Sequence, residues 1–287
     1  MTGRIFYPSA LLRKPQDRYA VMRCWAAAII LNLASASSCL ATDWQSTISK
    51  EPPGAFPALR PLRASYRFGW SGFTAATGEL HFMGQAGNRL QLEGAVHTTG
   101  LVRALWRLDG DLSALSDAET LHPIEMKQTE IYRRKKMVTQ VAFNAGGATR
   151  TRTEGPGLGT TTTKEFHFPN LFDLHSAALY LRSEPLKEHS TYRVAVYPAT
   201  SAYLATLTVL SREKISVHAG SYNAIKLDLK LSKIGKQMEL EPHRKFKRAS
   251  IWISDDANRL PLRIEAQIFV GTVFAELQSV EFDKPAP

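Results

Sequence analysis

Short segments in which apolar and polar residues alternate follow one another from residue 61 almost to the C-terminus. They are rich in β-branched and aromatic residues and are separated by Gly, Asn or Asp. Alternation with a period of two predicts antiparallel strands joined by hairpins. The expected strands are Leu62–Trp70, Thr77–Phe82, Arg89–Thr98, Trp106–Ser113, Ile124–Arg133, Val138–Phe143, Tyr192–Tyr197, Leu204–Leu210, Glu213–Val217, Ala224–Lys230, Arg248–Ser254, Leu262–Phe269 and Thr272–Phe282.

Two segments have helical spacing instead. Gly100–Trp106 predicts a short helical turn, and Leu171–Ser183 predicts a helix whose apolar face holds Leu171, Leu174, Ala178 and Leu181. Asn170 is the expected N-cap of that helix. The fold class is therefore mainly β. We expect one antiparallel curved sheet forming a barrel or half-barrel, with the central helix as a plug or lid on its concave face.

The segment 146–163 breaks the alternation. It contains several glycines, Pro156 and four consecutive threonines, and no regular apolar pattern. Gly and Pro favour turns and loops, so the sequence predicts a mobile loop here. This loop does not separate two domains.

The N-terminal residues have the zones of a secretion signal. The apolar run Cys24–Leu33 follows Arg18 and Arg23 and precedes a stretch of Ala and Ser. The run is far shorter than the roughly 20 residues of a membrane-spanning helix. Cleavage after Ala36 or Ala41 would fit, with Ala41 favoured, and Met22 is an alternative start.

We therefore expect residues 1–41 to be signal peptide and leader, 42–60 an extended arm, 61–283 a single β-rich domain and 284–287 a tail. Lipid attachment at Cys39 is a minor alternative, because the residues before it only loosely match a lipobox. Export predicts a periplasmic protein. Both cysteines lie in the leader, so the processed protein has neither disulfides nor thiolate chemistry.

The net positive charge of the chain indicates which class of partner it would bind. The whole chain has a net charge of +10, and +6 remains after removal of residues 1–41. A positive exported protein suits anionic envelope components rather than nucleic acid. Two basic clusters are candidate contacts, either as a basic rim for an anionic ligand or simply as solvated hairpin turns. They are Arg133, Arg134, Lys135 and Lys136, and Arg244, Lys245, Lys247 and Arg248.

Motifs for catalysis are not found. The eight histidines lack the spacing of metal ligands, and no G-x-S-x-G elbow or phosphate-binding loop occurs. Asp255 and Asp256 precede Pro261 in a pattern typical of a turn between strands. We accordingly assign no catalytic residue, no metal and no cofactor.

Two motifs in the second half resemble a known family. Residues 172–182 (FDLHSAALYLR) contain Asp173, Ser176 and Arg182, and residues 251–262 contain the motif residues Trp252, Asp255, Asp256 and Pro261. Together with the closing segment 271–277, they resemble the bacterial exported family called domain of unknown function 3108. The resemblance covers Tyr66 to Phe282.

This resemblance implies a secreted β-rich protein, with an architecture similar to the half-barrel lipoprotein carriers of the bacterial envelope. The family has no established activity, so it supplies no catalytic residue. Its motif residues are expected to be scaffold. In that interpretation Trp252 is a core aromatic residue, Asp255 and Asp256 form a turn, and Arg182 pairs with one of these two carboxylates.

Three functions follow as hypotheses. The first is non-enzymatic binding of an acyl chain or amphipathic envelope component in a concave cavity with a basic rim. The second is a structural or assembly factor that binds another envelope protein. The third is an envelope hydrolase using Asp173, Asp255 and Asp256, which requires these carboxylates to converge in a cleft with raised pKa values. The sequence leaves the oligomeric state open.

Overall fold

The structure, a computed structural model, describes residues 43–49, 52–57, 59–155, 159–243, 248–268 and 271–283. From Asp43 onward these residues belong to one compact unit. The predicted signal peptide, Cys39 and the tail 284–287 lie outside the described residues, as do Arg244, Lys245, Lys247 and the side chain of Arg248. No helix within the described ranges has the length and apolarity needed to cross a bilayer.

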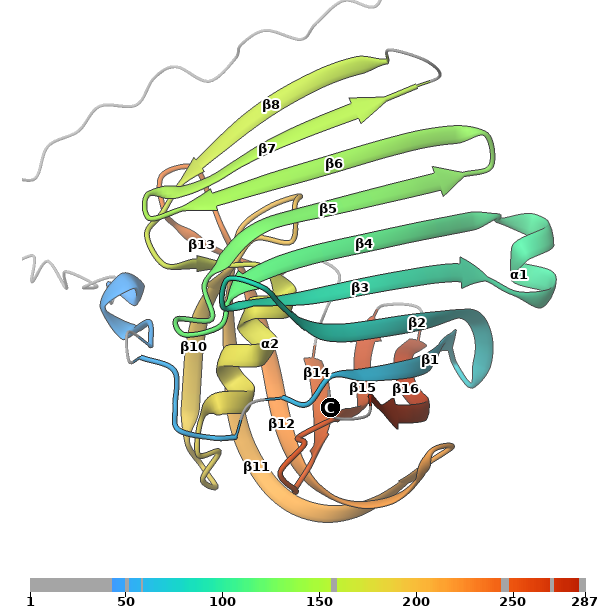
Figure 1. Ribbon diagram of the computed structural model, residues 1–287, viewed down its shortest axis with the longest axis vertical. Helices are drawn as coiled ribbons and strands as arrows, with labels where there is room; N and C mark the ends of the chain where they lie inside the picture. The colour runs from blue at the N-terminus through green and yellow to red at the C-terminus, as the bar shows by residue number, and fades with distance from the viewer. Residues whose placement is uncertain are drawn as a thin grey trace, which may run out of the picture. The chain divides into compact units, whose positions relative to one another are not determined.

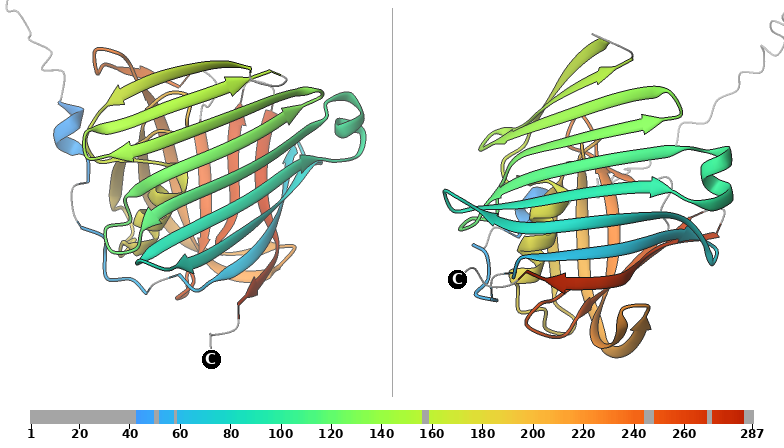
Figure 2. Two further views of the ribbon diagram at one scale, coloured as in Figure 1. Left: turned by 45° about the horizontal axis from the view of Figure 1, so that its top comes forward. Right: turned by 45° about the vertical axis from the view of Figure 1, so that its right-hand side comes forward.

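One curved, 16-stranded sheet makes up most of the chain, which confirms the predicted fold class (Figures 1 and 2). The strands are β1 (Leu62–Trp70), β2 (Phe73–Gln85), β3 (Arg89–Thr98), β4 (Leu108–Asp117), β5 (Pro123–Tyr132), β6 (Lys135–Asn144), β7 (Gly147–Glu154), β8 (Thr160–His167), β9 (Leu171–Phe172), β10 (Thr191–Val196), β11 (Tyr203–Val217), β12 (Gly220–Ile234), β13 (Leu240–Pro242), β14 (Arg248–Ser254), β15 (Pro261–Ile268) and β16 (Gly271–Phe282).

The sheet is open, so the half-barrel is the correct alternative. Strands β1 to β8 form a meander, and β1 also pairs with β16, which joins the two ends of the chain in the middle of the sheet. The path ends at β8 on one side and at β9 on the other. All pairings are antiparallel except that of β9 with β10.

The expected mobile loop at residues 146–163 is wrong, because most of this segment forms β7 and β8. Arg150 is buried on β7, whereas every residue of β8 except Phe166 is exposed. The alternation that identifies a strand was absent because, after Ala148, β7 turns the charged side chains of Arg150 and Arg152 toward the interior. Threonine also favours strands, which fits its abundance in both elements.

Residues 204–217 form one strand instead of the two expected strands. Strand β11 runs without interruption to Val217, and its pairing with β12 shifts register between Val209 and Ser211. A bulge of this kind places two successive residues opposite one partner and interrupts the alternation locally. The polar residues Ser211 and Arg212 therefore looked like a break in the sequence.

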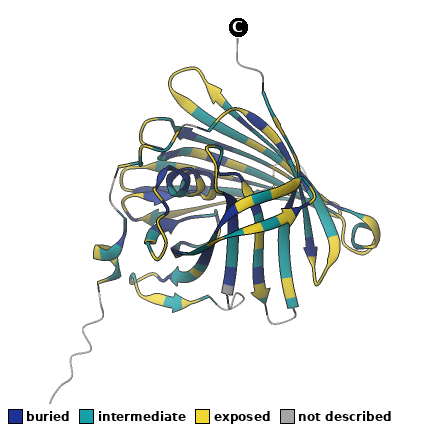
Figure 3. Ribbon diagram, turned by 90° about the horizontal axis from the view of Figure 1, so that it is seen from below, coloured by how far each residue is buried: buried dark blue, intermediate teal, exposed yellow. Residues whose placement is uncertain are grey.

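The central helix exists, but two of its details differ from the prediction. Helix α2 spans Leu174–Ser183, and its N-cap is Asp173 rather than Asn170. Leu171 and Phe172 belong to β9 and precede the helix. The predicted apolar face is also wrong, because Leu174 is exposed while Leu179 and Tyr180 are buried. Figure 3 shows this helix enclosed by the curved sheet.

The other helical elements are short. Helix α1 covers Gly100–Leu105 between β3 and β4, in agreement with the predicted turn, and the 3-10 helix η1 covers Trp44–Thr47. The segment expected to be an extended arm is fixed to the sheet. Trp44 stacks on Phe168 at 5.4 Å and donates to the carbonyl of Met238.

Two arginines hold the C-terminal end of α2. Arg182 donates to the carbonyls of Pro57, Ala257 and Asn258 at 2.9 to 3.1 Å. In return, Arg259 donates to the carbonyls of Arg182 and Glu184. Its guanidinium carbon lies 3.6 Å from the ring centroid of Phe56.

This exchange corrects the expectation that Arg182 pairs with a carboxylate. Its partners are backbone carbonyls, and burial followed by the nearby Arg259 lowers the pKa of Arg182 to about 10. The free carbonyls at the end of a helix carry partial negative charge, so those of Arg182 and Glu184 stabilise the Arg259 cation. We call the Arg182 and Arg259 side chains with these carbonyls the arginine latch.

Replacing Arg259 with Met should lower the free energy of unfolding by about 2–4 kcal/mol, because buried carbonyls lose their donors. Urea denaturation at neutral pH measures this change. Arg134→Met is the matched control, because Arg134 is exposed in a hairpin turn, and its effect should stay within about 0.5 kcal/mol. A comparably small effect of Arg259→Met would show that the latch contributes little.

Candidate functional site

The inner face of the sheet changes from apolar to polar between β2 and β8. Directly opposed residues on successive strands form three rows on this face. Leucine, valine, alanine, glycine and phenylalanine fill the β2 to β4 positions, and charged or hydroxyl side chains fill all the β7 and β8 positions. From β2 to β8 the rows are Phe82, Leu92, Ala114, Met126, Val141, Arg150 and Lys164; Leu80, Gly94, Leu112, Gln128, Thr139, Arg152 and Thr162; and Gly78, Val96, Gly110, Glu130, Met137, Glu154 and Thr160.

Three glycines make a hollow in the apolar part. Gly78 and Gly110 flank Val96, and Gly94 lies between Leu80 and Leu112 on the neighbouring strands. Each missing side chain therefore stands beside a large aliphatic one. A Cβ at Gly110 would lie 3.2 Å from a methyl carbon of Val96, so a larger residue there requires Val96 to move by a few tenths of an ångström.

The hollow is a cavity of about 260 Å³ between strands β1 to β5 and the first turn of α2. Most of its wall is apolar. The side chains that form this wall include Tyr66, Phe68, Leu80, Val96, Leu108, Leu112 and Met126, and the helix contributes Asp173, Leu174 and His175. We call it the inner cavity.

Asp173 and His175 bring polar groups to this apolar wall. Asp173 is fully buried, and one carboxylate oxygen accepts the backbone N–H of Ser176 at 2.6 Å. The other oxygen and Nε2 of His175 have no hydrogen-bond partner among the described residues. A buried polar atom without a partner costs about 1–3 kcal/mol, so such atoms call for an explanation.

Burial shifts the pKa values of Asp173 and His175 in the directions that disfavour their charged forms. It raises the pKa of Asp173 from 3.8 to about 6, although the backbone and hydroxyl of Ser176 act in the opposite direction. It lowers the pKa of His175 to about 4. At neutral pH the cavity therefore faces a neutral imidazole and an ionised carboxylate.

The carboxylates proposed for a hydrolase do not converge. Asp173 lies before the first residue of α2, whereas Asp255 and Asp256 belong to the turn that Arg182 contacts from the last turn of the helix. The helix has ten residues, so these sites are about 15 Å apart along its axis. Asp255 pairs with Arg212 at 3.0 Å, in an exposed position.

The other motif residues have structural contacts. Asp256 accepts from the hydroxyl of Ser254 and from the backbone N–H groups of Asn258 and Arg259, as a turn-forming aspartate does. Trp252 is buried and donates its indole N–H to Glu213 at 2.7 Å. The carbonyl of Pro261 accepts the hydroxyl of Tyr66, which lines the inner cavity.

The first of the two predicted basic clusters lies away from the inner cavity. Arg133 and Arg134 form the turn between β5 and β6, and Lys135 and Lys136 begin β6. None of the four lines the inner cavity. The buried Arg150 and the half-buried Arg152 on β7 were missed, although they lie on the inner face itself.

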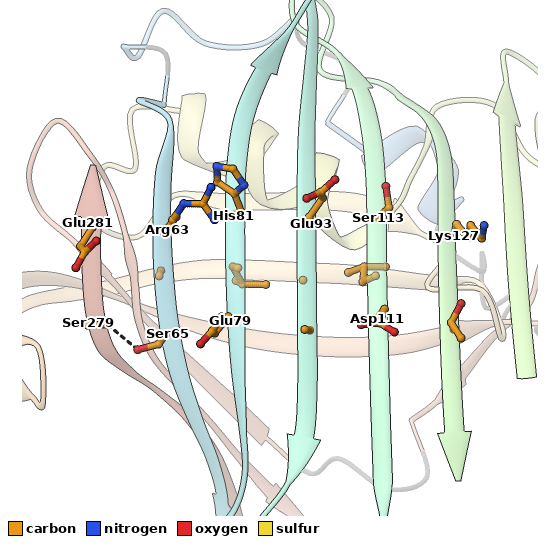
Figure 4. A pocket seen from close by; sticks show the side chains of 16 residues that line it. Arg63, Ser65, Glu79, His81, Glu93, Asp111, Ser113, Lys127, Ser279 and Glu281 are labelled. Atoms are coloured by element: carbon orange, nitrogen blue, oxygen red, sulfur yellow. Dashed lines mark hydrogen bonds between the residues drawn. The ribbon is translucent and has the colours of Figure 1, made fainter. Parts of the chain in front are cut away.

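A larger hollow of about 670 Å³ lies on the opposite face of the same strands (Figure 4). The labelled side chains in Figure 4 are charged or polar, and Glu79, Glu93, Asp111 and Lys127 are exposed to solvent. Solvated charges of both signs are typical of the outer face of a half-buried sheet. The inner cavity is smaller, but unlike this outer hollow it combines an apolar wall with buried polar atoms that lack partners among the described residues, so it is the candidate site.

Asp173→Asn tests the environment of this carboxyl group. The folded protein binds the Asp173 proton more tightly than the unfolded chain, so ionisation reduces stability as pH rises from about 4 to about 6. Asn keeps an oxygen for Ser176 and has no charge to bury. The variant should match the wild type at pH 4 and exceed it by ~2–3 kcal/mol at pH 7 in urea denaturation.

His175 changes stability in the opposite sense over pH 4 to 6.5, because burial lowers its pKa. Comparing the two proteins at each pH cancels this effect, since both contain His175. An Asn variant that is no more stable than the wild type at pH 7 would show that the carboxylate is solvated.

A solved structure shares the overall architecture. The β-barrel-like protein of domain of unknown function DUF1849 from Brucella abortus is similar with a TM-score of 0.54 and 10% identity, over 79% of this chain and 100% of that chain. A protein with a YmcC-like fold from Bacteroides fragilis matches with a TM-score of 0.35 and 7% identity, over 80% and 99% of the two chains. No curated protein sequence matches the chain.

A family model covers most of the sheet and the helix. The model described as "Protein of unknown function (DUF3108)" matches residues 65–278. This range includes the inner cavity, α2 and both motifs on which the sequence resemblance rests. The chain therefore belongs to the DUF3108 family.

Proposed function

We propose that the processed protein resides in the periplasm and binds the acyl chain of an anionic amphipathic envelope component in the inner cavity. The observation that carries this proposal is the apolar hollow on the concave face, built from glycines opposite large aliphatic side chains. Ligand sites of soluble proteins are concave, mostly apolar and equipped with a few polar groups. Export rests on the secretion signal in the sequence.

The polar side of the inner face supports an amphipathic ligand. Met126 lines the inner cavity, and Arg150 lies two strands further along the same row. Adjacent strands are about 4.8 Å apart, so the two positions are separated by about 10 Å. An acyl chain beside Met126 would thus place an anionic head group within reach of Arg150 and Arg152.

The arginines retain donors for such a head group. Arg150 uses one N–H to donate to the carbonyl of Ala199, and its Nε has no partner among the described residues. Arg152 lies 2.6 Å from Glu154, which satisfies part of its charge. A guanidinium suits carboxylates and phosphates because it offers several donors in one plane.

Cavity size limits the ligand. The volume of about 260 Å³ is slightly below the range of about 300–1,000 Å³ for small-molecule sites. The cavity therefore fits one apolar chain segment, with the rest of the ligand lying along the open inner face.

Filling the inner cavity should abolish acyl binding. Gly110→Leu places a side chain between Val96 and Glu130, and we expect at least about tenfold weaker binding of a fluorescent fatty acid. Ser113→Leu is the matched control, because Ser113 lies on the same strand and lines the larger hollow on the opposite face of the sheet. Fluorescence titration of both variants and the wild type measures the dissociation constants.

The two variants separate specific from general effects. Equal loss in both would indicate binding to exposed apolar surface, and equal affinity in all three proteins would locate the fatty acid elsewhere. Native mass spectrometry of the protein purified from its own periplasm is the second readout. Recovery of the protein without any bound amphiphile, together with unchanged affinity of Gly110→Leu, would refute the proposal.

A further inference from the structure

Large apolar side chains are exposed at one end of the half-barrel. They come from α1, from the residue that follows it, and from the turn between β1 and β2. Single exposed apolar residues are common on protein surfaces, but a cluster marks an interaction site. The exposed side chains are Leu101 (84%), Leu105 (77%), Phe73 (75%), Trp106 (56%) and Trp70 (47%).

Backbone contacts bring these segments together. The N–H of Thr99, just before α1, donates to the carbonyl of Ala75 on β2. Trp106 makes an edge-to-face contact with Tyr132 at the end of β5, with ring centroids 5.9 Å apart. Figure 1 shows α1 at the same end of the sheet as the β1–β2 and β5–β6 turns.

Basic residues lie directly beside this apolar cluster. Arg133 has no acidic partner in the described part of the chain. Its backbone N–H donates to the carbonyl of Arg107, and its guanidinium donates to the carbonyl of Leu105. Arg134 and Lys136 are exposed and form no ion pair with any described residue. Lys135 lies 3.5 Å from Glu154, and Arg103 and Arg107 share Asp109.

We propose that this end, which we call the apolar rim, docks on the surface of an anionic lipid bilayer. Interfacial segments combine Trp and Leu, which enter the boundary between head groups and acyl chains, with Lys and Arg, which contact anionic head groups. The rim has both classes of side chain within α1 and the neighbouring β1–β2 and β5–β6 turns. The surplus of positive charge beside the apolar residues is what favours a lipid surface over an apolar protein partner.

Docking at the rim would bring the inner cavity to the membrane. Val96 and Leu108 line the inner cavity, and they lie on the strands that enter and leave α1. The docking surface is nevertheless distinct from the cavity, because Leu101, Leu105 and Trp106 do not line it. Membrane binding can therefore be tested without any ligand.

Vesicle flotation tests the proposal with protein that has been secreted and processed. Wild type should bind vesicles of phosphatidylethanolamine and phosphatidylglycerol, and bind phosphatidylcholine vesicles much more weakly. The double variant Leu101→Asp/Leu105→Asp should bind at least about tenfold more weakly to the anionic vesicles. Leu240→Asp is the matched control, because Leu240 is a partly exposed leucine on β13, and it should bind as the wild type does.

Charge variants give an independent readout. Arg134→Gln and Lys136→Gln should each weaken binding to anionic vesicles about fivefold and leave binding to neutral vesicles unchanged. High salt should reduce wild-type binding in the same way. All variants share one N-terminus, so differences among them report the rim.

Three results would overturn the proposal. They are no wild-type binding to anionic vesicles, equal binding to neutral and anionic vesicles, and unchanged binding of the Leu101→Asp/Leu105→Asp variant. Crosslinking from the rim to one stoichiometric envelope protein, without vesicle binding, would assign the surface to that protein. The rim variants should bind the fluorescent fatty acid with the same affinity as the wild type. A failure of membrane docking would therefore not contradict acyl binding in the inner cavity.

Discussion

A single sheet must cover its own apolar face, and this requirement shapes the whole structure. One helix of ten residues spans about 15 Å, which is too little to cover the inner face of 16 strands. The sheet therefore curves around α2 (Figures 2 and 3). Its strands share hydrophobic core clusters with the helix and with each other. Because the glycines Gly78, Gly94 and Gly110 remove side chains from one part of this face, the curvature leaves the inner cavity there rather than a filled core.

The arginine latch fixes where the helix lies, and so fixes the polar wall of the cavity. Arg182 and Arg259 join the last turn of α2 to the loop between β14 and β15 and to the N-terminal segment at Pro57. With the C-terminal end held, the first turn must place Asp173 and His175 against strands β1 to β5. The family motifs that contain Arg182, Asp256 and Pro261 thus act on the site from a distance, through the position of the helix and of Tyr66.

The sequence predicts those parts of the structure in which local pattern and burial agree. Strands such as β3 and β16 alternate because their inner faces are apolar, and the strand pattern located both. It failed at β7, where Arg150 and Arg152 face inward. It located helix α2 but not the buried face of that helix, which includes His175 and Arg182. The inner cavity could not be predicted from the sequence for another reason. Gly78, Gly94 and Gly110 are unremarkable in sequence, and they become a hollow only when the register of two hairpins aligns them with Val96 and Leu112.

Electrostatics would orient the proposed ligand on the inner face. Above pH 6 the carboxylate of Asp173 is ionised at the α2 end of the inner cavity, and it repels an anionic head group there. Arg150 and Arg152 attract the same group toward β7. The apolar chain then lies between the two, along Leu112 and Met126, where the wall of the inner cavity is mostly apolar. A neutral amphiphile lacks this preference, since it neither avoids Asp173 nor gains a partner at the arginines, so the same arrangement that orients an anionic ligand also selects for it.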